Sequence, residues 1–155
     1  MLENMNRKPD AYAKVMGSAE FSQVQGNVYF FGVHGGTIVV AEIYGLPVSE
    51  NDPPSGNFHG FHIHEGADCT GTKAEPFKNA GGHLNPLKTD HPNHMGDLPP
   101  LMANEVMTWS AVYTERFYPE DVVGHTVIIH QMADDFHTQP SGNSGTMIAC
   151  GEIKE

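Results

Sequence analysis

The chain has 155 residues, with 19 acidic residues against 8 Lys and Arg and a formal net charge of −11. This charge argues against nucleic acids and anionic membranes as partners, because both repel an acidic surface. The length suits one domain, which we expect over residues 1–155, with residues 1–10 as a flexible N-terminus.

The predicted elements are short β-strands separated by turn residues. In chain order they cover residues 11–16, 28–31, 37–44, 57–64, 106–113, 126–130 and 146–150. Gly32, Gly35 and Gly36 lie between the second and third of these, as in a hairpin. Helical periodicity is not sustained over any stretch of about 11 residues, so the pattern indicates an all-β sandwich or barrel.

Two long irregular segments, residues 65–104 and 131–145, interrupt this pattern. Loops of that length usually have a function, and we expect a metal or a disulfide to hold the first one in place. Cys69 and Cys150 are the two cysteines of the chain. Composition alone leaves open whether they are buried thiols or a disulfide that ties the loop to the C-terminal strand.

No apolar segment follows the charged residues of the N-terminus, and no apolar run reaches about 18 residues. We therefore expect neither a signal peptide nor a transmembrane helix. A chain whose signal had been removed would read the same way.

Most of the ten histidines fall in tight groups. His62 and His64 are two apart in a predicted strand, so their side chains project from the same face. They could form half of a nitrogen-rich metal site, or a pair of surface histidines.

His91, His94 and Asp97 follow at spacings of three inside the long loop. Two imidazoles and a carboxylate suit zinc, although a polar turn around Pro92 and Gly96 would also explain them. His83 and His130 are unremarkable alone.

Together these seven residues exceed what one tetrahedral ion needs, which indicates two ions with a shared ligand. Imidazole suits copper and zinc especially well. A structural domain with zinc alone would leave His62, His64 and His130 without a purpose.

From about residue 13 to residue 153 the chain resembles the copper-zinc superoxide dismutases, in their bacterial type. The matching motifs are HGFHIHE (59–65), GGHLNPL (81–87), HMGDLP (94–99), VIIHQMADD (127–135) and GNSGTMIACG (142–151). The resemblance implies an eight-stranded Greek-key β-barrel, with a long zinc and disulfide loop and a second long loop near the metal site.

The resemblance also implies roles for single residues. The copper ligands would be His62, His64, His83 and His130, and the zinc ligands His83, His91, His94 and Asp97. His83 would thus bridge the two ions, and these copper-side histidines would be the catalytic residues. The gap between His91 and His94 is shorter than is usual in the family.

Three further positions follow from the resemblance. Asp134 matches a carboxylate that joins a copper histidine to a zinc histidine, here His62 to His91. Cys69 and Cys150 match the family's intrachain disulfide. His59 matches a structural position and stays outside the metal site.

One family residue is missing, an arginine beside the copper that attracts superoxide. Its position is Met147 here, three residues before Cys150. Met147 could be an apolar plug in the barrel mouth or a soft thioether near copper that favours Cu(I). The acidic surface adds a field that should slow an incoming anion unless lysines offset it.

We therefore expect a superoxide dismutase that cycles Cu(II) and Cu(I), slower than its relatives. The alternative is a related copper- and zinc-binding protein for copper buffering or storage, with little or no turnover. Superoxide is the expected small-molecule partner, and a homodimer is an assembly that the family suggests. The family's disulfide persists in reducing surroundings, so we expect a cytoplasmic protein, and an exported mature form also fits the sequence.

Overall fold

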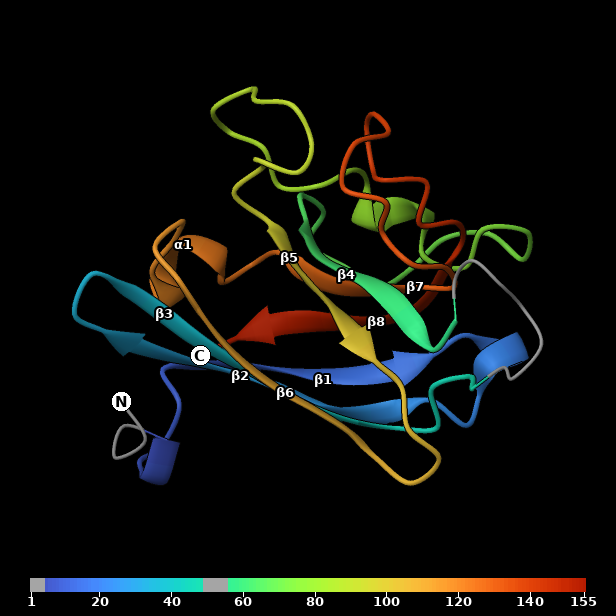
Figure 1. Cartoon of the computed structure of the whole chain (residues 1–155), viewed down its shortest axis with the longest axis horizontal. Coiled ribbons are helices and arrows are strands. Elements are labelled where there is room, and N and C mark those ends of the chain that lie inside the picture. The colour runs from blue at the N-terminus through green and yellow to red at the C-terminus, as the bar shows by residue number, and fades with distance from the viewer. Residues whose placement is uncertain (1–4, 49–55) are drawn as a thin grey trace.

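The computed structural model describes residues 5–48 and 56–155 (Figure 1). Within these ranges the chain forms eight strands, three short helical turns besides the one at Met5 and Asn6, and long connecting loops. The strands are β1 (Ala11–Gly17), β2 (Gln25–Val33), β3 (Gly36–Tyr44), β4 (Phe58–His64), β5 (Asp97–Met102), β6 (Thr108–Thr114), β7 (Thr126–His130) and β8 (Met147–Lys154). The turns are η2 (Ala19–Phe21), η3 (Lys78–Ala80) and α1 (Pro119–Val122).

All strand pairs are antiparallel, in the order β5-β4-β7-β8-β1-β2-β3-β6. β5 and β6 stand at the two ends of this order and contact each other, so the barrel is nearly closed. The non-sequential pairs β4–β7, β8–β1 and β3–β6 give it Greek-key connections. The prediction of an all-β barrel is confirmed.

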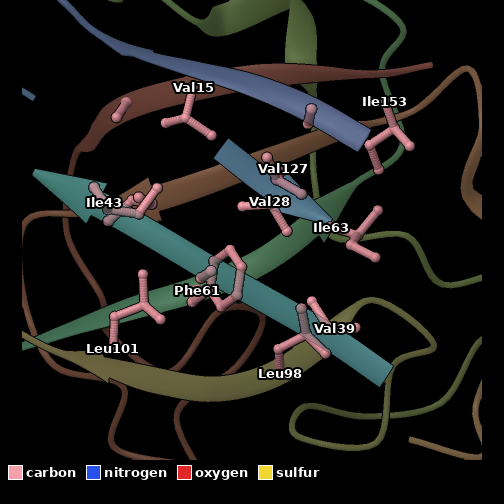
Figure 2. Packing of buried hydrophobic residues seen from close by; sticks show 14 of the residues in the cluster. Val15, Val28, Val39, Ile43, Phe61, Ile63, Leu98, Leu101, Val127 and Ile153 are labelled. Carbon is pink, nitrogen blue, oxygen red and sulfur yellow. The ribbon is translucent and has the colours of Figure 1, made fainter. Parts of the chain in front are cut away.

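Alternating side chains build the core inside the barrel. Along β1, Ala11, Ala13 and Val15 are buried while their neighbours are not. Figure 2 shows side chains from strands that are not paired with one another meeting in one cluster, including Val15 of β1, Val39 of β3 and Phe61 of β4. This packing fixes the strands that position the site.

β4 explains how the site is placed. Phe61 and Ile63 point into the core, so His62 and His64 must point to the opposite face. Those two histidines are nevertheless buried, at 0% and 3% exposure. Figure 1 shows both long loops gathered at the top of the view, beside β4 and β7, where they cover this face.

One expectation about the strands is wrong. β5 (Asp97–Met102) lies inside the segment that we expected to be a loop up to residue 104. Pro99 and Pro100 hide it in the sequence, because proline weakens a strand pattern. β5 stands at the end of the hydrogen-bonded order, where proline is tolerated.

The structure describes only part of the N-terminal segment. Residues 1–4 lie outside the described residues. Met5 packs against the outer apolar cluster of Phe31 and neighbouring side chains, and Arg7 pairs with Asp10 at 2.8 Å. Residues 5–10 are thus in contact with the barrel.

Two large aromatic side chains near the end of the barrel order differ in their exposure to solvent. Trp109 is 51% exposed on β6, whereas Phe117 is buried in the core at 2%. In the described parts of the chain, no helix is long and apolar enough to cross a membrane.

Candidate metal centre

Four histidines from three parts of the chain meet beside β4. His62 and His64 come from β4, and His130 ends the neighbouring strand β7. His83 comes from the long loop, held by a β-bridge to His64. One ring nitrogen of each of the four lies within 4.8 Å of the others.

The hydrogen bonds of His64 and His130 show which nitrogens face the centre. His64 Nδ1 donates to the Gly81 carbonyl at 2.8 Å, and His130 Nδ1 donates to the Gly145 carbonyl at 3.1 Å. In a neutral ring the Nε2 atom then has only a lone pair. The two Nε2 atoms lie 3.3 Å apart, and a cation bound by both resolves the conflict of two facing lone pairs.

Asp134 orients two more rings. Its carboxylate accepts hydrogen bonds from His62 Nε2 and His91 Nε2, both at 2.8 Å. Burial alone would raise the pKa of Asp134, but these bonds and one from the Phe136 N–H together lower that pKa to about 2. The Nδ1 atoms of His62 and His91 are left buried and without a hydrogen bond.

A second group lies on the other side of His83. His62, His83, His91 and Asp97 each place a ligand atom within 4.8 Å of the others. His94 joins them, with its Nδ1 3.2 Å from His83 Nδ1 and 3.3 Å from Asp97 Oδ2.

The spacing in this second group fits a tetrahedral ion. Zn–N bonds of about 2.0–2.1 Å place neighbouring ligand atoms about 3.3 Å apart. His91 Nδ1 lies 3.1 Å from Asp97 Oδ2, close to that value. His83 Nδ1 is nearer, at 2.7 Å from Asp97 Oδ1.

His83 therefore stands between two sets of ligands. Its Nδ1 faces Asp97 and His94, while its Nε2 is buried without a hydrogen-bond partner. Its ring centroid lies 4.0 Å from that of His62 and 4.9 Å from that of His64. The donor sets fit copper and zinc, since imidazole suits both and the carboxylate lies on the zinc-like side.

Burial keeps four of the site histidines neutral and ready to bind metal. Desolvation lowers the pKa of His62 to about 4 and that of His130 to about 3. It also lowers the pKa of His64 and, less strongly, that of His94. A neutral imidazole offers its lone pair at pH 7, so protons do not compete with a metal there.

A cavity of about 590 Å³ opens onto His64, His83 and His130. Met147, at the start of β8, lines this cavity and packs with Phe77. Met147 therefore lines the same cavity as His64, His83 and His130.

The charge around this cavity is acidic. Glu65 and Glu75 line it, and among the described residues of its wall there is no Lys or Arg. The Nζ atom of Lys78 is 3.4 Å from a Glu75 carboxylate oxygen, and both side chains are 60% exposed. An anion thus approaches past two carboxylates, one of them partly neutralised.

The two cysteines and three other histidines lie outside the metal centre. Cys69 and Cys150 form a disulfide that closes a sequence separation of 81 residues. Both ring nitrogens of His59 face backbone carbonyls, so His59 lies outside the metal centre. His125 bonds to the Glu65 carbonyl, and His137 is exposed.

Two residues that shape the site were not predicted from the sequence. Gly142 lies against Asp134 and His91, and the match of the GNSG segment to the family was its only signal. Arg116 bonds to three carbonyls of the zinc-side loop, and nothing in the sequence pointed to it.

Together, fold and site define a Greek-key β-barrel with two adjacent histidine-rich metal sites that share one histidine. The sequence profile of the family "Copper/zinc superoxide dismutase (SODC)" matches residues 15–153. The chain belongs to this family.

Individual relatives are consistent with this assignment. A "Superoxide dismutase [Cu-Zn]" of Deinococcus radiodurans is 33% identical, over 92% of this chain and 79% of that protein. The "Superoxide dismutase-like protein YojM" of Bacillus subtilis is 36% identical, over 70% of this chain and 61% of that protein. The solved "Cu/Zn superoxide dismutase from Brucella abortus" aligns with a TM-score of 0.76 at 26% identity, covering 94% of this chain and all of that one.

Proposed function

We propose that the chain is a superoxide dismutase with copper and zinc joined by His83. Copper would be held by His62 Nδ1 and by the Nε2 atoms of His64, His83 and His130. Zinc would be held by the Nδ1 atoms of His83, His91 and His94 and by Asp97. The observation that supports this most strongly is His83 itself, buried with one ring nitrogen toward each donor set.

When bound, copper supplies one-electron chemistry between Cu(II) and Cu(I), which oxidises one superoxide to O₂ and reduces the next to H₂O₂. The chain supplies the proton path. His83 would take one proton at Nε2 once that nitrogen no longer holds copper, and would give it to the reduced substrate, while its Nδ1 stays on the zinc side. The second proton of H₂O₂ would come from solvent water. The ionised Asp134 would keep the rings of His62 and His91 oriented throughout.

We further propose that turnover is slower than in relatives that have the arginine. Met147 offers neither charge nor a hydrogen-bond donor to a bound anion. The carboxylates of Glu65 and Glu75 repel superoxide as it enters the cavity, where the arginine of the relatives would attract it.

The His130→Ala variant tests the site. We expect it to lose most copper and all dismutase activity, because it removes one nitrogen of the copper set. His137→Ala is the matched control, since its side chain is 81% exposed and outside the centre. Metal content by mass spectrometry and a superoxide assay give the result, and full activity in His130→Ala would refute the assignment.

A second candidate is a copper- and zinc-binding protein without significant turnover, for copper buffering or storage. The lack of a cation among the described residues of the cavity wall favours it. The Bacillus subtilis relative is named only as superoxide dismutase-like, which agrees with it. Both candidates require both metals, so only the rate of the metal-loaded protein separates them.

A further inference from the structure

Arg116 follows β6 and reaches across to the back of the zinc-side loop. Its Nη1 atom donates to the carbonyls of Pro92 at 2.9 Å, His94 at 3.0 Å and Asp97 at 3.2 Å. An Nη atom has two hydrogens, so one of them is shared between two of these carbonyls. Two of the three carbonyls belong to residues whose side chains point into the metal centre.

This arrangement is unusual for an arginine on an acidic protein. In the described residues, Arg116 has no carboxylate within 4.0 Å, whereas the other arginine, Arg7, pairs with Asp10. The backbone N–H of Arg116 is itself bonded to Thr114 Oγ1. This bond links the backbone of Arg116 to the last residue of β6.

The loop needs such a contact. His91, His94 and Asp97 are three of the four residues on the zinc side, and only Asp97 lies in a strand. Fixing a loop backbone costs conformational entropy, and charge-assisted hydrogen bonds offset part of that cost. The side of the loop that would face zinc is already ordered by the bond from the His94 N–H to Asp97 Oδ2.

We propose that Arg116 is a positioning residue for the zinc site, which fixes the backbone of His94 and Asp97 from behind so that their donor atoms converge. This inference rests on the proposed zinc assignment. It predicts that Arg116 controls how long zinc is retained, while copper retention depends mainly on His62, His64 and His130, whose strands Arg116 does not touch.

The test measures release of zinc and of copper from the metal-loaded full-length protein into a chelator. Arg116→Met should release zinc about 10- to 100-fold faster than the wild type, with copper release nearly unchanged. Arg116→Lys keeps the charge without the planar fork and should give a smaller increase. If the Arg116→Met variant fails to fold, zinc release from Arg116→Lys can still be compared with that from the wild type. Arg7→Met removes the same charge elsewhere and should leave zinc release near the wild-type rate.

Cobalt(II) in the zinc site gives a second readout, because its visible spectrum reports ligand geometry. We expect Arg116→Met to change that spectrum and Arg7→Met to leave it unchanged. Zinc release within about threefold of wild type in Arg116→Met would overturn the inference while the zinc assignment stands. Equal acceleration of zinc and copper release would also overturn it, as a general loss of stability. A wild-type protein that retains no zinc would overturn the zinc assignment itself, and this inference with it.

Discussion

At the scale of single residues, the site depends on close backbone approach as well as on ligands. Gly142 has a φ of +70°, and a Cβ there would lie 2.0 Å from Asp134 Oδ1 and 2.7 Å from His91 Nε2. Any side chain at this position must displace the carboxylate that links the two halves of the centre.

Gly142→Ala should therefore lose metal, because it disrupts the Asp134–His91 contact. Gly124→Ala is the matched control, since Gly124 has a φ of +87° and a Cβ added there would meet nothing within 4 Å. Both variants should lose about 1–2 kcal/mol of stability from the left-handed backbone. Only Gly142→Ala should lose zinc and copper, measured by metal content. Equal metal content in the two variants would contradict this explanation.

The residue scale also shows what a sequence can predict. The pair His62 and His64 was predictable because a strand puts every second side chain on one face. Arg116 was not, because its partners are backbone carbonyls some twenty positions away, whose direction depends on the folded loop. Every residue has a backbone carbonyl, so the sequence does not show which carbonyls accept a hydrogen bond from a side chain.

At the scale of elements, β4 and its covering loops decide the geometry. Most strands were predictable from β-forming residues between turns, and β5 was not, because its two prolines mask a strand at the end of the order. The sequence also indicated that something must hold the first long loop. The contacts that hold it include the Cys69–Cys150 disulfide, the donor set around His83 and the hydrogen bonds from Arg116.

The double variant Cys69→Ser, Cys150→Ser tests the disulfide. Cross-linking a loop of this length constrains the unfolded chain, so we expect the variant to lose about 2–5 kcal/mol of unfolding free energy. Denaturant unfolding of the metal-free protein measures it, with chemically reduced wild type as the control. A change below about 0.5 kcal/mol would show that the disulfide does little for stability.

At the scale of the whole molecule, metal-free protein should be sensitive to acid. The folded pKa values of His62 and His130 are about 4 and about 3, whereas the unfolded chain should titrate near the ordinary value of 6.5. Between these values the unfolded chain binds more protons, so acid favours unfolding. This contribution is fully present above about pH 6.5 and is lost as pH falls toward the folded pKa values.

We therefore expect the thermal unfolding midpoint of the metal-free protein to decrease as the pH is lowered from about 7.5 to about 5. Metal-loaded protein is the control and should change less over this range, because bound metal excludes protons from the same nitrogens. An unchanged midpoint in the metal-free protein would mean that these histidines do not become protonated on unfolding.

The net charge of −11 and the carboxylates of the cavity act together on an incoming anion. Salt screens such repulsion, so the rate of superoxide dismutation should rise with ionic strength. Met147→Arg should raise the rate at low salt and make it fall as salt is added, because a cation at the cavity attracts the anion.

The most direct test is the rate constant for superoxide decay, measured by pulse radiolysis with protein fully loaded with copper and zinc. We predict a copper-dependent rate well above the uncatalysed background, which increases as salt is added. A rate equal to background at full metal occupancy would contradict the enzyme assignment and favour a metal-binding role for the same site.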